Sequence, residues 1–282
     1  HGARCAGRRN LLRGHAQRVF TVAFNSDGTL LASASHYKTL RLWNVADGKE
    51  VKKLEGHTGL VLGVAFSKDM RYIASASFDK TAKTWELPTP TPTRALAGHA
   101  EAVNGVALNN DGKFLASAST DKSVKIWDLA AGKETKAFAH PAPVNRVVYS
   151  VNGALLATIS ADQTLRIFNP AEAPEKAAVG VIEAHTQPII GLAFHPNNTQ
   201  VATSGTDGAI KLWELPVKAA RDIAGHAEAV NAIALSSDGA RVVSGGTDKS
   251  ARHHLIQTGA QERTFDGSTG PITAVAYSPD NQ

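Results

Sequence analysis

The stretch GHAEAVNGVALNNDGKFLASASTDKSVKIWD, residues 98–128, contains the features that recur along this chain of 282 residues. A Gly-His pair opens it, and an Asp-Gly turn, an Ala-Ser-Ala-Ser run and a Trp-Asp pair follow. A Gly-His or Ala-His pair recurs along the chain. The six histidines are His15, His57, His99, His140, His185 and His226, and Ser268 stands at the seventh equivalent place. Their spacings of 42, 42, 41, 45, 41 and 42 residues indicate a repeat protein.

The spacing within each repeat is stricter than the spacing between repeats. A turn residue lies 22 positions after the histidine in all six complete repeats, and a large ring lies six positions further on. The turn residues are Tyr37, Asp79, Asp121, Asp162, Asp207 and Asp248, and the rings are Trp43, Trp85, Trp127, Phe168, Trp213 and His254. All length variation therefore falls in one loop after the ring, as in a packed repeat with one tolerant face.

Each repeat predicts four short antiparallel strands. Alternating apolar residues follow the histidine, as in 103–108, and an Asp-Gly or Asn-Gly turn comes next in four repeats. Such turns suit tight hairpins because glycine accepts a positive φ. The Ala-Ser-Ala-Ser run predicts the second strand, the segment that ends in the ring predicts the third, and a segment such as 51–54 predicts the fourth.

This pattern resembles the WD-repeat β-propeller family. Gly-His near the start and Trp-Asp at the end of the third strand carry the resemblance, with Trp127-Asp128 as the full dipeptide. It extends from about Arg8 to Gln282. We therefore expect an all-β fold, a seven-bladed WD-repeat propeller with six complete four-stranded blades and an incomplete seventh that begins near Ser268. The expected domains are a tail over 1–7 and a single propeller over 8–282.

The two ends predict that the natural polypeptide is longer. The seventh repeat reaches Gln282 before its ring, so it supplies one strand, over about 271–278. Segment 8–13 has the pattern of a fourth strand, and propellers of the resembled family commonly close by pairing such a strand with C-terminal ones. Without those partners we expect irregular order over 1–13, an open edge that promotes association, and at least about 20 more residues after Gln282.

The recurring His, Ser and Asp residues have two interpretations. One is a hydrolase triad. We favour a structural role, because an active site occurs once whereas this set recurs with the repeat. The resemblance implies a hydrogen-bonded tetrad in which the aspartate accepts, the histidine relays and the buried indole N–H donates. The expected tetrads are His57, Ser77, Asp79 and Trp85 in the second repeat, and His99, Ser119, Asp121 and Trp127 in the third.

Other repeats depart from this tetrad. The departures are Tyr37 at the aspartate place, Phe168 and His254 at the tryptophan place, and Gly205 and Gly246 at the serine place. Each lost hydrogen bond costs about 0.5–1.5 kcal/mol. We therefore expect the second and third repeats to be the most rigid and the sixth to be the least rigid.

Composition limits the classes of function. The 30 basic and 25 acidic residues are spread along the chain apart from an Arg-rich start, which favours solubility over nucleic-acid binding. No apolar run approaches the roughly 18 residues of a membrane span. The single cysteine, Cys5, allows no intramolecular disulfide and fits a cytoplasmic location, with an exported one left open. His253-His254 has no Cys or carboxylate at ligand spacing, so we expect no metal and no cofactor.

The function expected from these features is a non-catalytic scaffold for protein–protein interaction. In WD-repeat relatives partners often bind the top-face rim, three and five positions after the histidine and one before the turn aspartate. In the first two repeats these positions hold large, mostly apolar groups: Arg18, Phe20, His36, Leu60, Leu62 and Phe78. Exposed apolar clusters with aromatic and Arg anchors often bind partners, although these side chains could instead pack sideways on the next blade.

The expected partners are other proteins or peptides, including further domains of a longer chain. The alternative function is a ligand-sensing or enzymatic propeller module of a larger protein that uses the central channel. That function needs convergent polar or charged groups on the first strands, where the sequence offers mostly Val, Ala, Thr and Asn. Catalytic residues are therefore not expected.

Overall fold

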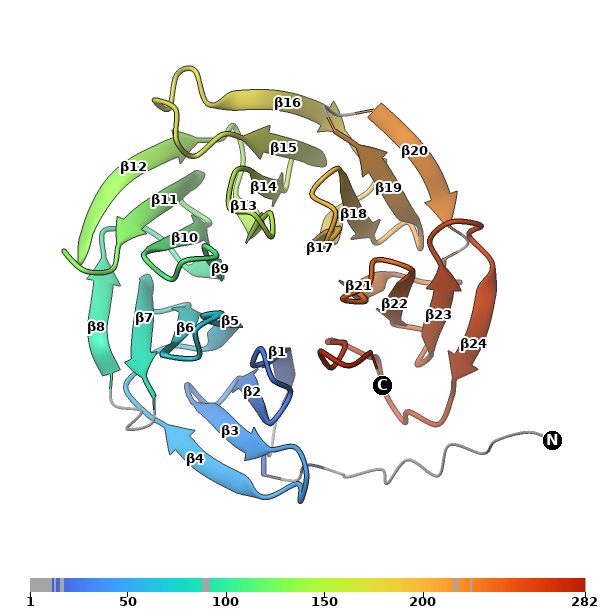
Figure 1. Cartoon of the computed structure of the whole chain (residues 1–282), viewed down its shortest axis with the longest axis horizontal. Helices are drawn as coiled ribbons and strands as arrows, with labels where there is room; N and C mark the ends of the chain where they lie inside the picture. Colours follow the sequence, from blue (N-terminus) through green and yellow to red (C-terminus); the bar gives the residue numbers. More distant parts are fainter. Residues whose placement is uncertain are drawn as a thin grey trace.

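The computed structural model describes residues 12, 14–15, 18–87, 92–215, 218–223 and 225–281. Within these residues, six four-stranded antiparallel sheets are arranged around a central axis as the blades of a propeller (Figure 1). Each blade contains four consecutive strands, with the first strand innermost and the fourth outermost. In this part of the chain, no helix has the length and apolar character needed to cross a membrane.

The first three blades follow one another in chain order. Blade one contains β1 (Val19–Phe24), β2 (Leu30–Ser35), β3 (Leu40–Asn44) and β4 (Glu50–Leu54). Blade two contains β5 (Val61–Phe66), β6 (Tyr72–Ser77), β7 (Thr81–Glu86) and β8 (Pro92–Ala97). Blade three contains β9 (Val103–Leu108), β10 (Phe114–Ser119), β11 (Ser123–Asp128) and β12 (Lys133–Ala139).

The other three blades have the same organisation. Blade four contains β13 (Val144–Tyr149), β14 (Leu156–Ser160), β15 (Thr164–Phe168) and β16 (Ala178–Glu183). Blade five contains β17 (Ile189–Phe194), β18 (Gln200–Gly205), β19 (Ile210–Glu214) and β20 (Lys218–Ile223). Blade six contains β21 (Val230–Leu235), β22 (Arg241–Gly246), β23 (Ala251–Leu255) and β24 (Gln261–Phe265).

The prediction of a seven-bladed propeller with an incomplete seventh blade is wrong. The described residues form six blades, and the strand expected over about 271–278 does not form, since residues 266–281 contain no strand. A lone segment has no second strand with which to build a ladder, so its backbone stays irregular. The expected strand over 8–13 lies outside the described residues apart from Leu12, as does the tail over 1–7.

The C-terminal segment links the last blade to the first. It enters the ring between β21 and β1 (Figure 1). The Ile272 backbone donates to Gly246 O and accepts from the Asn231 side chain, both at 3.0 Å. Thr273 Oγ1 donates to Val19 O at 2.7 Å. Hydrogen bonds of a single irregular segment therefore join the two ends of the ring of blades.

The hydrophobic cores lie between neighbouring blades. Trp85 of β7 is fully buried and packs with Leu40 and Leu54 of blade one. Trp127 of β11 packs in the same way against Ala74 and other residues of blade two. The alanines of the Ala-Ser-Ala-Ser run are small enough to leave room for the ring of the next blade. Burial of such aromatic surfaces, at about 25 cal/mol per Å², is the main force that holds adjacent blades together.

Candidate functional site

Four side chains connect the histidine loop of blade two to β6, to β7 and to the turn between them. His57 Nδ1 lies 2.7 Å from Asp79 Oδ2, and His57 Nε2 lies 2.7 Å from Ser75 Oγ. The indole Nε1–H of Trp85 donates to the same Ser75 Oγ at 2.9 Å. Blade three repeats this arrangement with His99, Asp121, Ser117 and Trp127.

The charges of this network follow from burial. Burial raises the pKa of the Asp79 carboxyl, but hydrogen bonds from Thr81 and His57 outweigh it and bring that pKa to about 2. Burial lowers the pKa of His57, and the Asp79 carboxylate only partly offsets this effect. The network therefore holds a carboxylate beside a neutral imidazole near neutral pH, with each polar atom occupied by a structural partner.

The serine in the network is Ser75 rather than the expected Ser77. Trp85 lies opposite Ile73 in the β6–β7 register, so its indole N–H reaches two residues along β6 to Ser75. Ser77 stands at the end of the strand and accepts the Asp79 backbone N–H at 3.1 Å, which shapes the turn. The same correction applies in blade three.

In blade three the network serine is Ser117 rather than Ser119. Ser119 Oγ accepts the Asp121 backbone N–H at 3.1 Å and donates to Ala102 O at 2.8 Å. Both expected serines therefore act in their turns. The network position two residues earlier holds Ser or Thr in all six blades: Ser33, Ser75, Ser117, Thr158, Thr203 and Ser244.

The expected loss of the serine bond at Gly205 and Gly246 is wrong for this reason. In blade five Thr203 Oγ1 lies 2.8 Å from His185 Nε2 and accepts the Trp213 indole N–H at 2.9 Å. A side chain at position 205 would be crowded, because a Cβ there would lie 2.9 Å from His185 Nδ1. Blade five therefore has a complete network, which removes the reason to rank it below blades two and three.

Blade four departs from the network in a way that the sequence reasoning missed. His140 Nε2 lies 2.9 Å from Thr158 Oγ1, but its Nδ1 lies 3.2 Å from the Phe138 carbonyl. Asp162 turns away and pairs with Arg166, with 2.8 Å between Oδ2 and Nη2. Burial without a carboxylate partner lowers the pKa of His140 to about 4.

We expect Ser75→Ala to destabilise the protein more than Ser77→Ala. Ser75→Ala leaves the buried Trp85 indole N–H and His57 Nε2 without their shared partner, at about 1–3 kcal/mol for each unpaired group. Ser77→Ala removes one turn acceptor, and the natural glycines at 205 and 246 indicate that this place tolerates loss of the hydroxyl. Equilibrium urea unfolding compares the two variants. Equal losses would place Ser77 in the network after all.

The expected rim residues lie side by side in each blade. The backbone N–H of His36 donates to Arg18 O at 3.1 Å, and that of Phe78 donates to Leu60 O at 2.9 Å. The same bond occurs in the other four blades, where the donor and acceptor pairs are Thr120 and Ala102, Ala161 and Pro143, Thr206 and Pro188, and Thr247 and Ala229. In every blade this backbone bond places the residue before the turn residue next to the one three positions after the histidine.

Blade one presents a stack of three side chains at its rim. Arg18 Cζ lies 5.4 Å from the centroid of the Phe20 ring, and the Phe20 and His36 rings stack at 6.3 Å with 24° between their planes. Blade two, which lies next to blade one in the ring (Figure 1), presents Phe78 with 60% of its surface exposed. We call Arg18, Phe20, His36, Leu60, Leu62 and Phe78 the rim surface. Its binding role stays a prediction.

Blades one, two and five lack a bridge that blades three, four and six have. Asn104, Asn145 and Asn231 lie five positions after the repeat histidine and donate to a carbonyl of the following segment, at 2.9, 3.3 and 3.0 Å. Phe20 and Leu62 occupy the same place in blades one and two and have no group to donate. Partly exposed apolar side chains therefore replace a stabilising hydrogen bond at these two positions.

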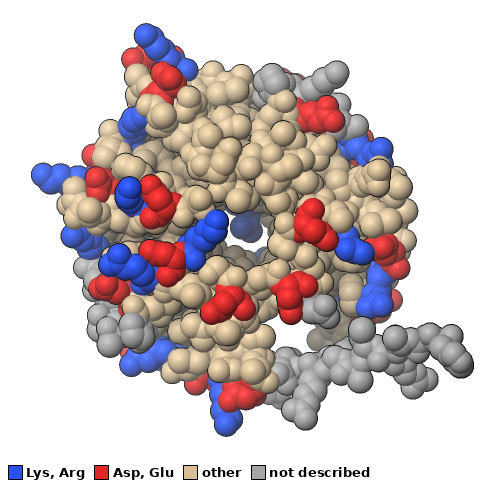
Figure 2. All heavy atoms as spheres, viewed as in Figure 1, with Lys and Arg blue, Asp and Glu red and all other residues tan. Residues whose placement is uncertain are grey.

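A charged residue in the central channel was missed by the sequence reasoning. Figure 2 shows an opening through the middle of the ring, with blue atoms of a Lys or Arg side chain inside it. Arg146 of β13 lines two hollows of this channel, of about 350 and 120 Å³. The signal was present in the sequence. The places six positions after the histidine are Thr21, Gly63, Gly105, Arg146, Gly191 and Ala232, and five of these residues are small.

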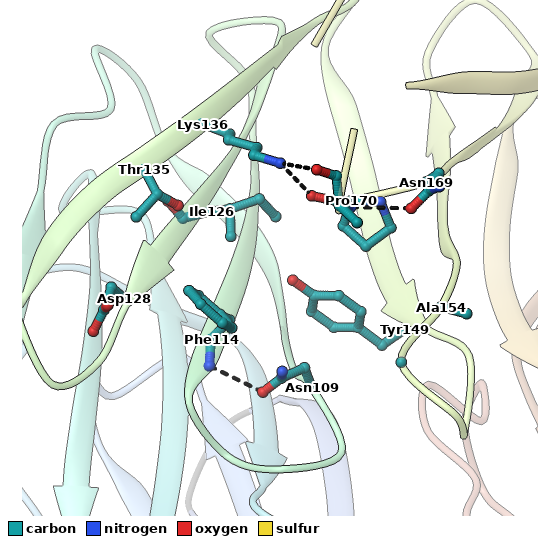
Figure 3. A pocket seen from close by; sticks show the side chains of 12 residues that line it. Asn109, Phe114, Ile126, Asp128, Thr135, Lys136, Tyr149, Ala154, Asn169 and Pro170 are labelled. Atoms are coloured by element: carbon teal, nitrogen blue, oxygen red, sulfur yellow. Dashed lines mark hydrogen bonds between the residues drawn. The ribbon is translucent and has the colours of Figure 1, made fainter. Parts of the chain in front are cut away.

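Another hollow, of about 490 Å³, lies between blades three and four (Figure 3). Its walls include Phe114, Ile126, Tyr149 and Pro170. Lys136 Nζ donates to three consecutive carbonyls, 170–172, at 2.7, 2.8 and 2.8 Å. All three ammonium protons have acceptors, so Lys136 ties β12 to the loop after β15 and leaves the hollow with an apolar character.

His253 and His254 lie next to each other on β23 but have different surroundings. His253 Nδ1 lies 3.1 Å from Glu262 Oε2 of β24, a carboxylate that the sequence spacing did not indicate because strand pairing brings it near. His254 is fully buried. Over the described ranges, no three His, Cys, Asp or Glu side chains are grouped as a metal site would need.

Comparison with known proteins identifies the repeats. A family model described as "WD domain, G-beta repeat" matches residues 7–44, 48–86, 90–128, 132–169, 177–214 and 218–254. From 48 onward, each match takes in the outermost strand of one blade and the three inner strands of the next, as β4 with β5, β6 and β7. The sequence repeat is therefore offset by one strand from the blade, which interlocks neighbouring blades through the chain.

Curated relatives match about a third of the chain. Cilia- and flagella-associated protein 52 of Chlamydomonas reinhardtii is 36% identical over 93 residues, 32% of this chain and 15% of that protein. Guanine nucleotide-binding protein subunit beta of Arabidopsis thaliana is 31% identical over 101 residues, 33% of this chain and 27% of that protein. Protein HIRA of Dictyostelium discoideum is 33% identical over 119 residues, 33% of this chain and 11% of that protein.

The matched segment thus spans well under a third of each of these relatives, whereas the repeat model covers most of this chain. The six matched repeats contain every strand of the six sheets except β24, the outermost strand of blade six. The chain therefore belongs to the WD-repeat family of β-propellers.

Proposed function

We propose that this chain is a non-catalytic scaffold that docks partner proteins or peptides on the rim surface of blades one and two. WD-repeat propellers are typically interaction scaffolds and are generally non-catalytic. One relative is named as a subunit of a guanine nucleotide-binding protein, which is consistent with a role in assembly. The single observation that carries the proposal is the exposed Phe78 in the blade next to the Arg18–Phe20–His36 stack.

The exposure of these side chains argues against a purely structural role. Phe78 exposes 60% of its surface, and Arg18 and His36 are also exposed. Fully burying one such ring against a partner contributes about 1.5–3 kcal/mol, and aromatic and Arg residues are the side chains most often found at binding hot spots. Side chains whose only role was to pack on the next blade would be buried there rather than exposed.

The chemistry of the rim surface indicates the kind of partner. Phe20, Leu60, Leu62 and Phe78 offer apolar contacts, and Arg18 has no ion pair within the described part of the chain. A partner segment with apolar anchors and an adjacent Asp or Glu would satisfy both features, because the guanidinium can pair with a carboxylate while the rings bury the anchors.

We expect the double variant Phe20→Ala/Leu62→Ala to weaken partner binding by at least about tenfold, since two hot-spot side chains are truncated. Peptides selected from a random library against the wild-type protein serve as the partner, and fluorescence anisotropy gives the dissociation constants. The matched control is Val51→Ala on the outer strand β4, where an apolar side chain is 52% exposed outside the rim surface. The control should bind like the wild type.

The same variants separate binding from stability. The melting temperature of Phe20→Ala/Leu62→Ala should stay close to that of the wild type, because both side chains are partly exposed. A large drop in melting temperature would show that the two residues belong to the core. Selected peptides that bind the double variant as well as the wild type would place the docking surface elsewhere.

A further inference from the structure

The six inner strands meet around the channel at equivalent positions. Six residues after each repeat histidine the side chain is absent or small in five blades, and blade four alone has an arginine there. The inner strands approach closely at this level, since a Cβ on Gly105 would lie 3.4 Å from Arg146 Cα. Small residues allow the inner strands to approach one another, and Arg146 is the exception that places a cation beside the channel.

The guanidinium of Arg146 is anchored at one end. Its Nε donates to Ile190 O of the next blade at 2.7 Å. No hydrogen bond joins its two Nη groups to the described residues, and the side chain remains partly accessible from the channel. The planar fork is therefore fixed by Nε and leaves the paired Nη donors for another acceptor.

The channel provides no charge to balance Arg146. Among the described residues that line its two hollows, Arg146 is the charged one, and the rest are apolar residues, glycines and threonines with the phenol of Tyr149. Burial lowers the pKa of Arg146, and no carboxylate acts against this effect. A half-buried charge without a carboxylate partner is unfavourable to a fold, and a residue that breaks the local pattern at a cost to stability often has a function.

We propose that the central channel binds a small organic carboxylate through the Nη groups of Arg146. This site shares Phe20 with the rim surface, because that ring lines the smaller hollow beside Arg146. Recognition of the carboxylate by Arg146 does not depend on the proposed scaffold function. The guanidinium fork matches the two oxygens of a carboxylate, and one cation with no second basic group matches a single negative charge. The walls, among them Val64, Val106, Leu192 and Ile233, suit an apolar body behind the carboxylate.

The size of the hollows limits the ligand. One water molecule needs roughly 10–15 Å³ of such a hollow, so the hollow of about 120 Å³ beside Arg146 has room for several non-hydrogen atoms. The hollow of about 350 Å³ extends the space along blades one to five. Propionate and benzoate are therefore suitable probes, and their uncharged counterparts propionamide and benzamide keep the shape without the charge.

Isothermal titration calorimetry on the complete chain tests the proposal. We expect benzoate and propionate to bind the wild type, the two amides to bind at least about tenfold more weakly, and inorganic phosphate to bind more weakly than benzoate, because no second cation is present. Arg146→Gln should weaken benzoate binding by at least about tenfold. Arg71→Gln, the same change at an exposed arginine, should leave it unchanged.

A second pair of variants covers the chance that Arg146→Gln folds poorly. Arg146→Lys keeps the charge and loses the fork, and it should also weaken benzoate binding. Arg146→Met removes the unpaired charge, so its melting temperature without ligand should equal or exceed that of the wild type. Benzoate should then raise the melting temperature of the wild type and Arg71→Gln by a few degrees and leave that of Arg146→Met unchanged.

The outcomes that overturn the proposal are specific. They are no carboxylate binding to the wild type, equal binding of benzoate and benzamide, tighter binding of phosphate, or unchanged benzoate affinity in Arg146→Gln. A marked fall in the melting temperature of Arg146→Met would assign the arginine to a structural link with Ile190 and would also overturn it. If a rim-binding peptide with a Glu residue displaces benzoate, the carboxylate comes from a docked partner; otherwise it comes from a free small acid.

Discussion

Trp85→Ala should lower the free energy of unfolding by about 3–5 kcal/mol, a large part of the stability of an ordinary domain. Trp85 is fully buried and packs with Leu40, Leu54 and Ile73, so its ring joins blade one to blade two. The substitution removes this contact area, leaves a cavity between two sheets that cannot readily close, and takes away the indole donor to Ser75.

Urea unfolding measures the effect, with the midpoint and the slope of the transition determined together. Phe78→Ala is the matched control, since it truncates an aromatic residue of the same blade whose ring is 60% exposed. This control should change the free energy of unfolding by no more than about 0.5 kcal/mol. A loss below about 1 kcal/mol in Trp85→Ala would show that the ring does not hold the two blades together.

The spacing of the repeats predicts the six blades because each marker has a direct physical role. The ring must fill the gap to the preceding blade, the alanines must leave room for it, and the turn must reverse the chain at a fixed distance. Trp85 and Trp127 therefore recur at constant spacing, and the strands between the markers follow. The family resemblance adds the propeller arrangement, which local patterns alone do not fix.

The number of blades was mispredicted because the opening pattern of a repeat can occur in a segment that does not form a blade. Segment 266–281 has the opening pattern of a repeat, yet a strand forms only with a hydrogen-bonded neighbour. The prediction of Ser77 as the network serine was wrong for a related reason. Ser75 and Ser77 both lie on β6, and only the pairing of Trp85 with Ile73 determines which hydroxyl the indole reaches.

Blade four differs from blades two and three at the residue after the histidine, and this difference is visible in the sequence. In blade two the backbone N–H after the histidine, that of Thr58, donates to the Asp79 carboxylate at 3.0 Å. Blade four has Pro141 at the equivalent place, and proline has no N–H to donate. Asp162 lacks this donor, and it pairs with Arg166. His140 is then buried without a carboxylate, which has a consequence for stability in acid.

Acid should destabilise the protein in a window set by its buried histidines. Burial lowers the pKa of His57, His99, His140 and His185 below the ordinary value of 6.5, and brings that of His140 to about 4. The folded state therefore favours the neutral imidazoles, and below 6.5 the unfolded state binds more protons. Stability is fully present above 6.5 and falls as the pH drops toward the folded pKa values.

Carboxylates act in a separate window. The pKa of Asp79 is lowered from 3.8 to about 2, so its contribution to stability is present above 3.8 and falls only between 3.8 and about 2. A loss of stability between pH 6.5 and about 5 is therefore assigned to the histidines rather than to the tetrad aspartates. Unfolding measured above about pH 5 reports mainly on the imidazoles, because carboxyl groups with unfolded pKa values near 4 take up protons below that pH.

His140 should contribute about 3 kcal/mol to the loss between pH 6.5 and 4, because each pKa unit corresponds to about 1.4 kcal/mol. His140→Phe removes this titration. The His140 ring lies beside the packed Phe138 and Phe168 rings, so this place can accommodate another aromatic side chain. We expect the dependence of the variant's unfolding free energy on pH to be shallower than that of the wild type in this window.

Phe168→Leu is the control, because it removes packing but no titratable group. It should lower the unfolding free energy at every pH and leave the dependence on pH unchanged. Urea titrations from pH 7 to 4 decide the matter, since parallel curves for His140→Phe and the wild type would mean that His140 stays neutral in both states or titrates equally in both.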